Sequence, residues 1–500
     1  MQLRPSTYRA TALALTLAVV VAMPSASYAA TNAIFTIAGT GVAGFSGGDG
    51  TLAVAAQLNQ PYSVSATPDG GFLLADFANN RVRRVSALGT ITTVAGNGTA
   101  GYSGDDGPAT LAKLYGPASV SATADGGFLI AEAYNHRIRR VSPAGTITTV
   151  AGGLGAGYGG DGGPATTAKL LYPFAVAATP DGGFLVADTY NHRIRRVSPA
   201  GTITTIAGVG TSGFSDDDRL ATTAKLYYPF GVAAAAGGSV LIADTYNNRI
   251  RRVTPDGTIT TIAGNASVGF IGGGPATSAS LYRPFGIASL ADGGFLIADT
   301  YNHRIRRVSP SGTISTVAGT GTAGFSSDGG PATAAQINYA YGVATTADGG
   351  FLIPDRQNHR VRFVDSDLRP APVPTATVAP SATSPSSPSA DHSVLGSQTT
   401  SEQPRAFTRL ALALTSDRLR LKRNRRGRIR YVVTTAGSVW LDVLRGKSVV
   451  TSAQGRARTG HNALTLTRRG LAPGRYRLRL RARTSDGQLA SDFARLTIYR

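Results

Sequence analysis

Apolar and polar positions alternate along short runs that recur through most of this chain. One copy contains PFAVAAT (Pro173–Thr179), FLVAD (Phe184–Asp188), RIRRV (Arg193–Val197) and TITTIAG (Thr202–Gly208), with turns between them. Val, Ile and Thr occupy both faces of these runs, which is typical of strands buried on both sides of a sheet. Asp181-Gly182 between the first two runs is a strong hairpin signal. The pattern predicts four antiparallel strands in each copy.

An acidic residue ends the second run of every copy. The six copies are spaced by 55 or 56 residues, at Asp76, Glu132, Asp188, Asp244, Asp299 and Asp355. Repeats of four antiparallel strands arranged radially form a β-propeller, which has about four to eight blades. We therefore predict an all-β fold with a six-bladed propeller over residues 30–365.

The strand count predicts how the ring closes. The fourth run follows only the first five copies, at Thr90, Thr146, Thr202, Thr258 and Thr313. A run of the same type, AIFTIAG (Ala33–Gly39), precedes the first copy. We expect this N-terminal strand to complete the sixth blade, because closure removes exposed sheet edges.

A Gly-rich insert links each fourth strand to the next blade. Four inserts place a proline where it would begin a short helix, at Pro108, Pro164, Pro275 and Pro331. Four carry an aspartate three residues before that position, at Asp105, Asp161, Asp217 and Asp328. Capping of the loop is the favoured role of these aspartates. Calcium binding is the alternative, with Asp216, Asp217 and Asp218 as the candidate ligands; otherwise we expect no cofactor.

Aromatic residues recur at two positions on the face that bears the inserts. The inner set, interrupted at Ala118, consists of Tyr62, Phe174, Phe230, Phe285 and Tyr341. The outer set, which the sequence interrupts at Phe77 and Gln357, consists of Tyr134, Tyr190, Tyr246 and Tyr301. These rings could stack on a sugar or a partner side chain, or they could pack blade against blade. They are our candidate binding residues.

The histidines and ion pairs follow the repeat, which favours a structural role. His136, His192, His303 and His359 occupy one turn position. Asp188 ends one strand, and Arg193, Arg195 and Arg196 lie on the next, so we expect structural ion pairs there. No catalytic residue is assigned. A non-catalytic binding protein is therefore favoured over the alternative, a propeller lyase or hydrolase with a metal at the channel mouth.

The first residues have the pattern of a targeting segment. Arg4 and Arg9 precede the apolar run Thr11–Ala22, and small residues lie before a cleavage position after Ala29. We predict a signal peptide over residues 1–29 and a secreted, extracellular or cell-wall associated monomer without a transmembrane segment after processing. The chain has no cysteine, which excludes disulfides and thiolate ligands.

Charge is concentrated at the other end of the chain. The net charge is +21, and residues 401–500 hold 23 Lys and Arg against 5 acids. Residues 366–404 are rich in Pro, Ser and Thr, which predicts a disordered linker. Residues 405–500 return to short alternating runs, which predict a small basic β-sandwich.

The densest basic segment could bind an anionic cell-wall polymer in a salt-dependent way. Its cations are Arg418, Arg420, Lys422, Arg423, Arg425, Arg426, Arg428 and Arg430. The alternative is that a GC-rich coding sequence enriches the segment in arginine and that these residues have no binding role. Specific nucleic-acid recognition is not expected.

Three motifs resemble the NHL-repeat family in its bacterial secreted form: IADTYNHRIRRV (Ile297–Val308), TITTVAG (Thr90–Gly96) and GDGGPAT (Gly160–Thr166). The family triplet becomes Asn-His-Arg at Asn135, Asn191, Asn302 and Asn358, and Asn-Asn-Arg at Asn79 and Asn247. The resemblance implies a six-bladed propeller that serves protein-binding, RNA-binding or sensor roles; related propellers include lyases and lactonases.

The basic C-terminal module resembles immunoglobulin and fibronectin III domains. Leu471–Tyr476 is similar to their tyrosine corner. Together, these features lead us to expect a binding or scaffold protein that recognises a protein or carbohydrate on one propeller face, while the basic module associates with the cell envelope.

Overall fold

The computed structural model describes residues 32–46, 49–326 and 328–365, and eight strands between Leu412 and Tyr499. Every helical segment in these described parts is a three-residue 3-10 turn. The remaining residues, among them the predicted signal peptide and linker, lie outside the described residues. None of the helices in the described parts is long and apolar enough to cross a membrane.

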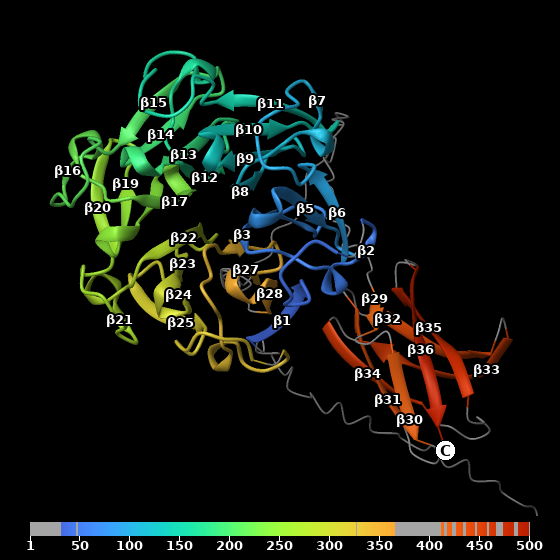
Figure 1. Cartoon of the computed structure of the whole chain (residues 1–500). Coiled ribbons are helices and arrows are strands. Elements are labelled where there is room, and N and C mark those ends of the chain that lie inside the picture. Colours follow the sequence, from blue (N-terminus) through green and yellow to red (C-terminus); the bar gives the residue numbers. More distant parts are fainter. Residues whose placement is uncertain are drawn as a thin grey trace, which may run out of the picture.

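Residues 32–365 form six sheets arranged around a central axis (Figure 1). The innermost strands are β3 (Pro61–Ala66), β8 (Pro117–Ala122), β12 (Pro173–Ala178), β17 (Pro229–Ala234), β22 (Pro284–Ser289) and β26 (Ala344–Thr345). The second strands are β4 (Phe72–Asp76), β9 (Phe128–Glu132), β13 (Phe184–Asp188), β18 (Val240–Asp244), β23 (Phe295–Asp299) and β27 (Phe351–Asp355).

The outer half of each blade follows the same order. The third strands are β5 (Arg81–Val85), β10 (Arg137–Val141), β14 (Arg193–Val197), β19 (Arg249–Val253), β24 (Arg304–Val308) and β28 (Arg360–Asp365). The outermost strands are β6 (Thr90–Ala95), β11 (Thr146–Ala151), β15 (Ile203–Ala207), β20 (Thr258–Ala263), β25 (Thr313–Ala318) and β1 (Ala33–Ala38). The prediction of an all-β, six-bladed propeller is confirmed.

Strand β1 closes the ring, as the strand count predicts. It pairs antiparallel with β28, with Ala33 opposite Asp365 and Phe35 opposite Phe363. Ile34 is fully buried in the same core cluster as Phe351 and Val364. The first strand of the propeller therefore completes the last blade.

Hydrophobic cores lie between neighbouring blades. For example, Leu185 and Ile194 of the third blade belong to one cluster with Ile242 and Ile259 of the fourth. Equivalent clusters fill the other interfaces. Because each blade buries apolar side chains on both faces, no blade has a core of its own.

The inserts differ in detail from the sequence prediction. In four of them a two-residue strand adds to the outermost strand, at β2 (Thr51–Leu52), β7 (Gly107–Pro108), β16 (Arg219–Leu220) and β21 (Gly274–Pro275). A 3-10 turn follows, and Pro108 is its N-cap and not its first residue. Proline is extended there because the insert is still paired with the blade: Thr146 lies opposite Pro108. The predicted helix start was therefore wrong by one position.

The insert turns are η1 (Ala53–Ala55), η3 (Ala109–Leu111), η5 (Ala165–Thr167), η7 (Ala221–Thr223), η10 (Ala276–Ser278) and η12 (Ala332–Ala334). A second set follows each second strand: η2 (Phe77–Asn79), η4 (Ala133–Asn135), η6 (Thr189–Asn191), η9 (Thr245–Asn247), η11 (Thr300–Asn302) and η13 (Arg356–Asn358). One further turn, η8 (Ala236–Gly238), replaces the Asp-Gly hairpin of the fourth blade.

The C-terminal strands form two sheets. β29 (Leu412–Leu414), β31 (Gly427–Val433) and β34 (Gly460–Leu466) make the smaller sheet. The larger sheet has the order β30 (Arg418–Lys422), β36 (Leu489–Tyr499), β35 (Gly474–Thr484), β32 (Gly437–Arg445) and β33 (Ser448–Ala457). Val439, Leu441 and Val443 of β32 are buried.

Candidate functional site

A buried arginine joins each blade to its insert. Arg195 is fully buried, and its guanidinium lies 3.3 Å from Asp188 of its own blade and 2.6 Å from Asp161 of the insert. Burial raises the pKa of Asp188 to about 6 against the effect of its hydrogen bonds and of Arg195, so the carboxylate is ionised at neutral pH. The predicted structural ion pair is confirmed, and Asp161 stabilises the insert through it.

The insert of the fifth blade has no acidic residue, and backbone carbonyl groups bind its buried arginine instead. Arg306 donates hydrogen bonds to the carbonyl oxygens of Ile271 and Gly272, each at 2.9 Å. A carbonyl can replace the carboxylate there because Arg306 still has Asp299 within 3.5 Å.

Two of the three candidate calcium ligands, Asp216 and Asp217, lie near different arginines. Asp217 pairs with Arg251 at 2.9 Å and accepts a hydrogen bond from Thr261. Asp216 is exposed and lies 4.0 Å from Arg219. The described residues contain no group of three or more His, Cys, Asp or Glu arranged to hold a metal.

The four repeated histidines join neighbouring blades. The Nδ1 atoms of His136, His192 and His359 accept hydrogen bonds from the backbone N–H groups of Tyr172, Tyr228 and Gln60 at 3.1 to 3.2 Å, and His303 does the same for Tyr339 at 3.4 Å. Burial lowers the pKa of each of these histidines. Only an unprotonated Nδ1 can accept this hydrogen bond, so the contact requires the neutral form that burial favours.

The inner aromatic set meets across the axis of the propeller. Consecutive ring centroids lie 4.3 to 5.9 Å apart in Tyr62, Phe174, Phe230, Phe285 and Tyr341, which we call the aromatic plug. Tyr62 is buried, and burial raises its pKa well above the ordinary value. These residues pack against each other at one mouth of the channel.

The gap that Ala118 leaves in the plug is filled from a neighbouring turn. Ala118 forms a cluster with Tyr62 and Phe77, and the Tyr62 and Phe77 rings lie 5.1 Å apart. Phe77 was predicted to interrupt the outer aromatic set, and this prediction was wrong. Ala78, and not Phe77, is equivalent to Tyr190. The Ala78 N–H donates to the Asn59 carbonyl, just as the Tyr190 N–H donates to the Leu171 carbonyl.

The outer set belongs to a larger group of exposed and half-buried tyrosines. This group, the tyrosine face, consists of Tyr115, Tyr134, Tyr172, Tyr190, Tyr227, Tyr228, Tyr246, Tyr282, Tyr301 and Tyr339. Contacts of 4.7 to 6.0 Å connect successive rings from Tyr115 to Tyr246. Tyr134 and Tyr190 remain 40% and 41% exposed. The structure thus brings the predicted residues together on one face.

Sequence reasoning missed six members of this face: Tyr115, Tyr172, Tyr227, Tyr228, Tyr282 and Tyr339. Five of them precede the proline that begins an innermost strand, and Tyr339 precedes Ala340 at the equivalent position of the sixth blade; all six lie outside the repeated motifs. The signal was an aromatic residue before that proline in several copies. Tyr172, Tyr228 and Tyr339 have φ between +45° and +53°, in the left-handed region that non-glycine residues rarely adopt.

Two arginines accompany the tyrosines. The Arg283 guanidinium lies 4.4 Å from the Tyr246 ring centroid and 5.0 Å from that of Tyr301. Arg356 lies 4.6 Å from the Tyr341 ring and donates a 2.6 Å hydrogen bond to Gln60. These contacts give the face a positive charge within an aromatic surface.

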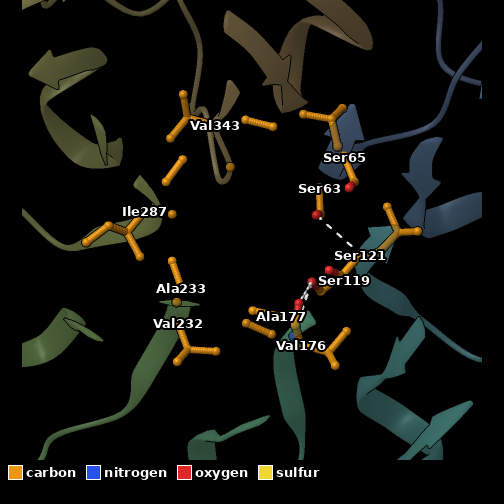
Figure 2. A pocket seen from close by; sticks show the side chains of 18 of the residues that line it. Ser63, Ser65, Ser119, Ser121, Val176, Ala177, Val232, Ala233, Ile287 and Val343 are labelled. Atoms are coloured by element: carbon orange, nitrogen blue, oxygen red, sulfur yellow. Dashed lines mark hydrogen bonds between the residues drawn. The ribbon is translucent and has the colours of Figure 1, made fainter. Parts of the chain in front are cut away.

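Below the plug lies a cavity of about 340 Å³, lined by the innermost strands (Figure 2). Four of the six Ser and Thr residues that line it, Ser63, Ser65, Ser119 and Ser121, lie on β3 and β8, and the other two are Ser289 of β22 and Thr345 of β26. Ser121 accepts a hydrogen bond from the Ala178 N–H at 3.0 Å, and Ser65 accepts one from Ala122 at 3.1 Å. These serines join neighbouring blades inside the channel.

The basic candidates on the C-terminal strands are only partly described. Arg418, Arg420 and Lys422 lie on β30, and Arg428 and Arg430 lie on β31. Arg423, Arg425 and Arg426 lie outside the described residues, and so does the conformation of the Tyr476 side chain.

Radial sheets around a channel, joined by buried ion pairs and closed by the first strand, define a six-bladed β-propeller. Two of its repeats match the sequence profile of the NHL repeat, at residues 170–197 and 281–308. Both matches end with the RIRRV strand that carries the buried arginine, Arg195 in one and Arg306 in the other.

Known proteins share the repeat region. The chain is 29% identical over 288 residues to the chloroplastic Protein SUPPRESSOR OF QUENCHING 1 of Arabidopsis thaliana, an alignment that covers 55% of this chain and 27% of that protein. It is 27% identical over 354 residues to Teneurin-m of Drosophila melanogaster, which covers 62% of this chain. The alignment spans only 12% of Teneurin-m.

Two solved structures from Bacteroides thetaiotaomicron share the fold. One, a protein of unknown function, has a TM-score of 0.51 and 19% identity and covers 67% of this chain and 75% of its own. The other, described as an auxiliary nutrient binding protein, has a TM-score of 0.50 and 18% identity, with 66% and 75% coverage.

Proposed function

We propose that this protein is a secreted binding protein whose tyrosine face recognises a protein or carbohydrate ligand. The observation that carries the proposal is the array of tyrosine rings that remain exposed or half-buried around the aromatic plug. Tyrosine combines an apolar ring with a hydroxyl group, which suits recognition surfaces. The description of one structural neighbour as a nutrient binding protein supports a binding role.

A glycan array and a pull-down with the full chain test this proposal. The Tyr190→Ala/Tyr246→Ala variant should lose the ligands that the unaltered chain retains, since it removes two central rings. Leu88→Ala is the matched control, because Leu88 is 59% exposed in the turn between β5 and β6, at the opposite end of the strands. Equal capture by all three proteins would contradict the proposal.

Association of the basic module with an anionic envelope polymer is the second part of the proposal. In the larger C-terminal sheet, Arg418 lies opposite Arg495, and Arg495 lies opposite Arg477 on the next strand. Arg475, Arg477, Arg479, Arg481 and Arg483 occupy every second position of β35. Repulsion between such neighbours would be relieved by a polyanion.

The charge part has its own measurement. Full-length protein with Arg477→Gln, Arg479→Gln and Arg481→Gln should elute from immobilised teichoic acid at lower salt than the unaltered protein, because fewer counterions are released on binding. The Tyr190→Ala/Tyr246→Ala variant should elute unchanged. Elution of the triple variant at the original salt concentration would refute this part.

The targeting segment completes the proposal. Export with cleavage after Ala29 would leave Ala30 as the first residue of the mature chain. N-terminal sequencing of the protein from culture medium or cell wall tests this, and an intact Met1 there would contradict it.

A further inference from the structure

Arg283 and Arg356 occupy positions where the other blades carry no cation. Arg283 precedes the proline of its innermost strand, where equivalent positions hold Gln60, Gly116, Tyr172, Tyr228 and Tyr339. Arg356 begins its turn, where equivalent positions hold Phe77, Ala133, Thr189, Thr245 and Thr300. Neither residue is required by the repeat, in contrast to the six buried arginines.

The partners of these two arginines are neutral. Arg283 contacts the Tyr246 and Tyr301 rings, and its Nη1 lies 3.5 Å from the Tyr301 hydroxyl. Arg356 donates to the Gln60 amide and lies over Tyr341. Among the described residues, no ion pair joins either guanidinium to a carboxylate, whereas Arg195 meets two.

The neighbouring carboxylates are turned away from the face and already engaged. Asp299 and Asp355 are fully buried and lie within 3.5 Å of Arg306 and Arg362. Their other oxygen atoms accept hydrogen bonds from the backbone N–H groups of Tyr282 and Asn338. The charge on Arg283 and Arg356 is therefore not neutralised locally.

A sector of neutral amides adjoins Arg356. Asn59 and Gln60 of the first blade and Asn338 and Gln357 of the sixth take positions that hold tyrosines in other blades. Amide side chains both donate and accept hydrogen bonds, as the hydroxyl groups of a sugar require. The rest of the face offers ring surfaces on which a pyranose can stack.

We propose that the tyrosine face binds an acidic oligosaccharide, with tyrosine rings against uronic-acid sugars and Arg283 and Arg356 on their carboxylates. This inference rests on the proposed binding function and narrows its ligand. A guanidinium binds a carboxylate through two parallel hydrogen bonds, and an aromatic surround keeps it weakly hydrated. The amide sector favours a sugar over an acidic peptide, because a peptide offers few hydroxyl groups.

The test compares acidic trisaccharides with their methyl esters, which keep the sugar rings and remove the charge. Trimers of galacturonic, mannuronic and glucuronic acid are titrated into full-length protein by isothermal calorimetry. The variant is Arg283→Gln/Arg356→Thr, because this chain already holds Gln60 and Thr300 at the equivalent positions, so the fold should be preserved. Arg252→Gln is the control, since Arg252 is an exposed arginine near the opposite end of its strand.

We expect at least one acidic trimer to bind about tenfold or more tightly than its ester, as charge-assisted hydrogen bonds imply. The double variant should lose that preference, and Arg252→Gln should keep it. Since all variants carry the same C-terminal segment, its charge contributes equally throughout.

Three outcomes would overturn the inference. Equal binding of acid and ester, with both weakened by Tyr190→Ala, would refute the charge selection and leave the proposed function standing. Tighter, arginine-dependent binding of a tetraglutamate peptide would make the ligand an acidic peptide. Absence of binding to all trimers would refute the acidic sugar, while the separate pull-down would still decide the proposed function.

Discussion

At the scale of single residues, the residue after the repeated asparagine of each turn supplies one hydrogen-bond acceptor. His192 accepts from the Tyr228 N–H through Nδ1 at 3.2 Å, and Asn248 accepts from the Arg283 N–H through Oδ1 at 2.9 Å. Both residues take left-handed backbone angles, with φ of +54°. Histidine and asparagine therefore alternate in the triplet because both supply this acceptor.

The two residues should be interchangeable, and alanine should not replace either. His192→Ala leaves the Tyr228 N–H without its acceptor and should lower the free energy of unfolding by about 1–3 kcal/mol. His192→Asn should change it by less than about 0.5 kcal/mol. Urea unfolding measures both, and equal losses in the two variants would contradict the role of the acceptor.

The same contact predicts a loss of stability in acid. Burial lowers the pKa of His136, His192, His303 and His359 in the folded state. As pH falls through the ordinary histidine pKa of about 6.5, the unfolded chain takes up protons first, so this contribution to stability declines. It is fully present above that pH and is lost as pH falls through the folded-state pKa.

A variant with all four histidines changed to asparagine isolates this effect. The wild type should lose more of its melting temperature than the variant between about pH 7.5 and pH 5. The buried aspartates, which titrate in both proteins, cancel in the comparison. Parallel melting curves across the range would show that these histidines are not linked to stability.

The histidine turn was foreseen as structural from its repetition, but its hydrogen bond was not. The acceptor and donor, His192 and Tyr228, lie 36 residues apart in different blades. Their contact depends on how one blade is rotated against the next, which a local pattern does not specify.

At the scale of elements, the insert that contains Asp161 is held by an ion pair with a buried arginine, whereas the hairpin of the third blade forms an ion pair with a partly exposed one. Asp161 of the insert meets the fully buried Arg195, whereas Asp181 of the hairpin meets the half-exposed Arg196. The two aspartates lie in the same region of the chain and differ in the burial of their partner. This difference makes them a matched pair.

Asp161→Ala should destabilise the protein by roughly 1–3 kcal/mol, because Arg195 loses one of its two carboxylates while remaining buried. Asp181→Ala should cost less than about 1 kcal/mol, since exposed ion pairs contribute little. Thermal unfolding of the two variants measures the difference. A larger loss in Asp181→Ala would contradict this account of the insert.

Strands were easier to predict than inserts for a physical reason. Alternation and the Asp-Gly turns specify the four-stranded blade through local rules. The insert follows long-range contacts, such as the hydrogen bond from Ala109 to Gly145 beyond the next three strands. Local rules place Pro108 at the first position of a helix, but in the folded insert it is the N-cap of a short 3-10 turn.

At the scale of the whole molecule, one strand holds the ring together. Deletion of residues 33–39 removes β1 and leaves the edge of β28 unpaired. The propeller should unfold at lower temperature or oligomerise through that edge. Light scattering and thermal unfolding measure both effects, and a synthetic peptide of the deleted segment should restore the melting temperature. A deleted protein that stays monomeric and melts unchanged would contradict closure by β1.

The ring and its closure could be predicted by counting repeats, because repetition fixes how many units share a core. For the residues of the aromatic plug, the sequence left two roles open: stacking on a ligand, or packing of one blade against another. Phe285 and Tyr341 stack at 4.3 Å, yet they come from different blades that meet only when the ring is complete. For the same reason, the sequence did not predict that Phe77 fills the space beside Ala118.

The pairing of β1 with β28 also sets an order of events in the life of the chain. Ala33 and Asp365 are partners, so the first strand to leave the ribosome waits for the last strand of the propeller before it can pair. Closing so long a loop is slow and late in folding. Until β1 and β28 pair, each has an edge without a partner strand. The chain must avoid pairing with other chains during that time. Every copy becomes a complete ring only after synthesis of the repeats has ended.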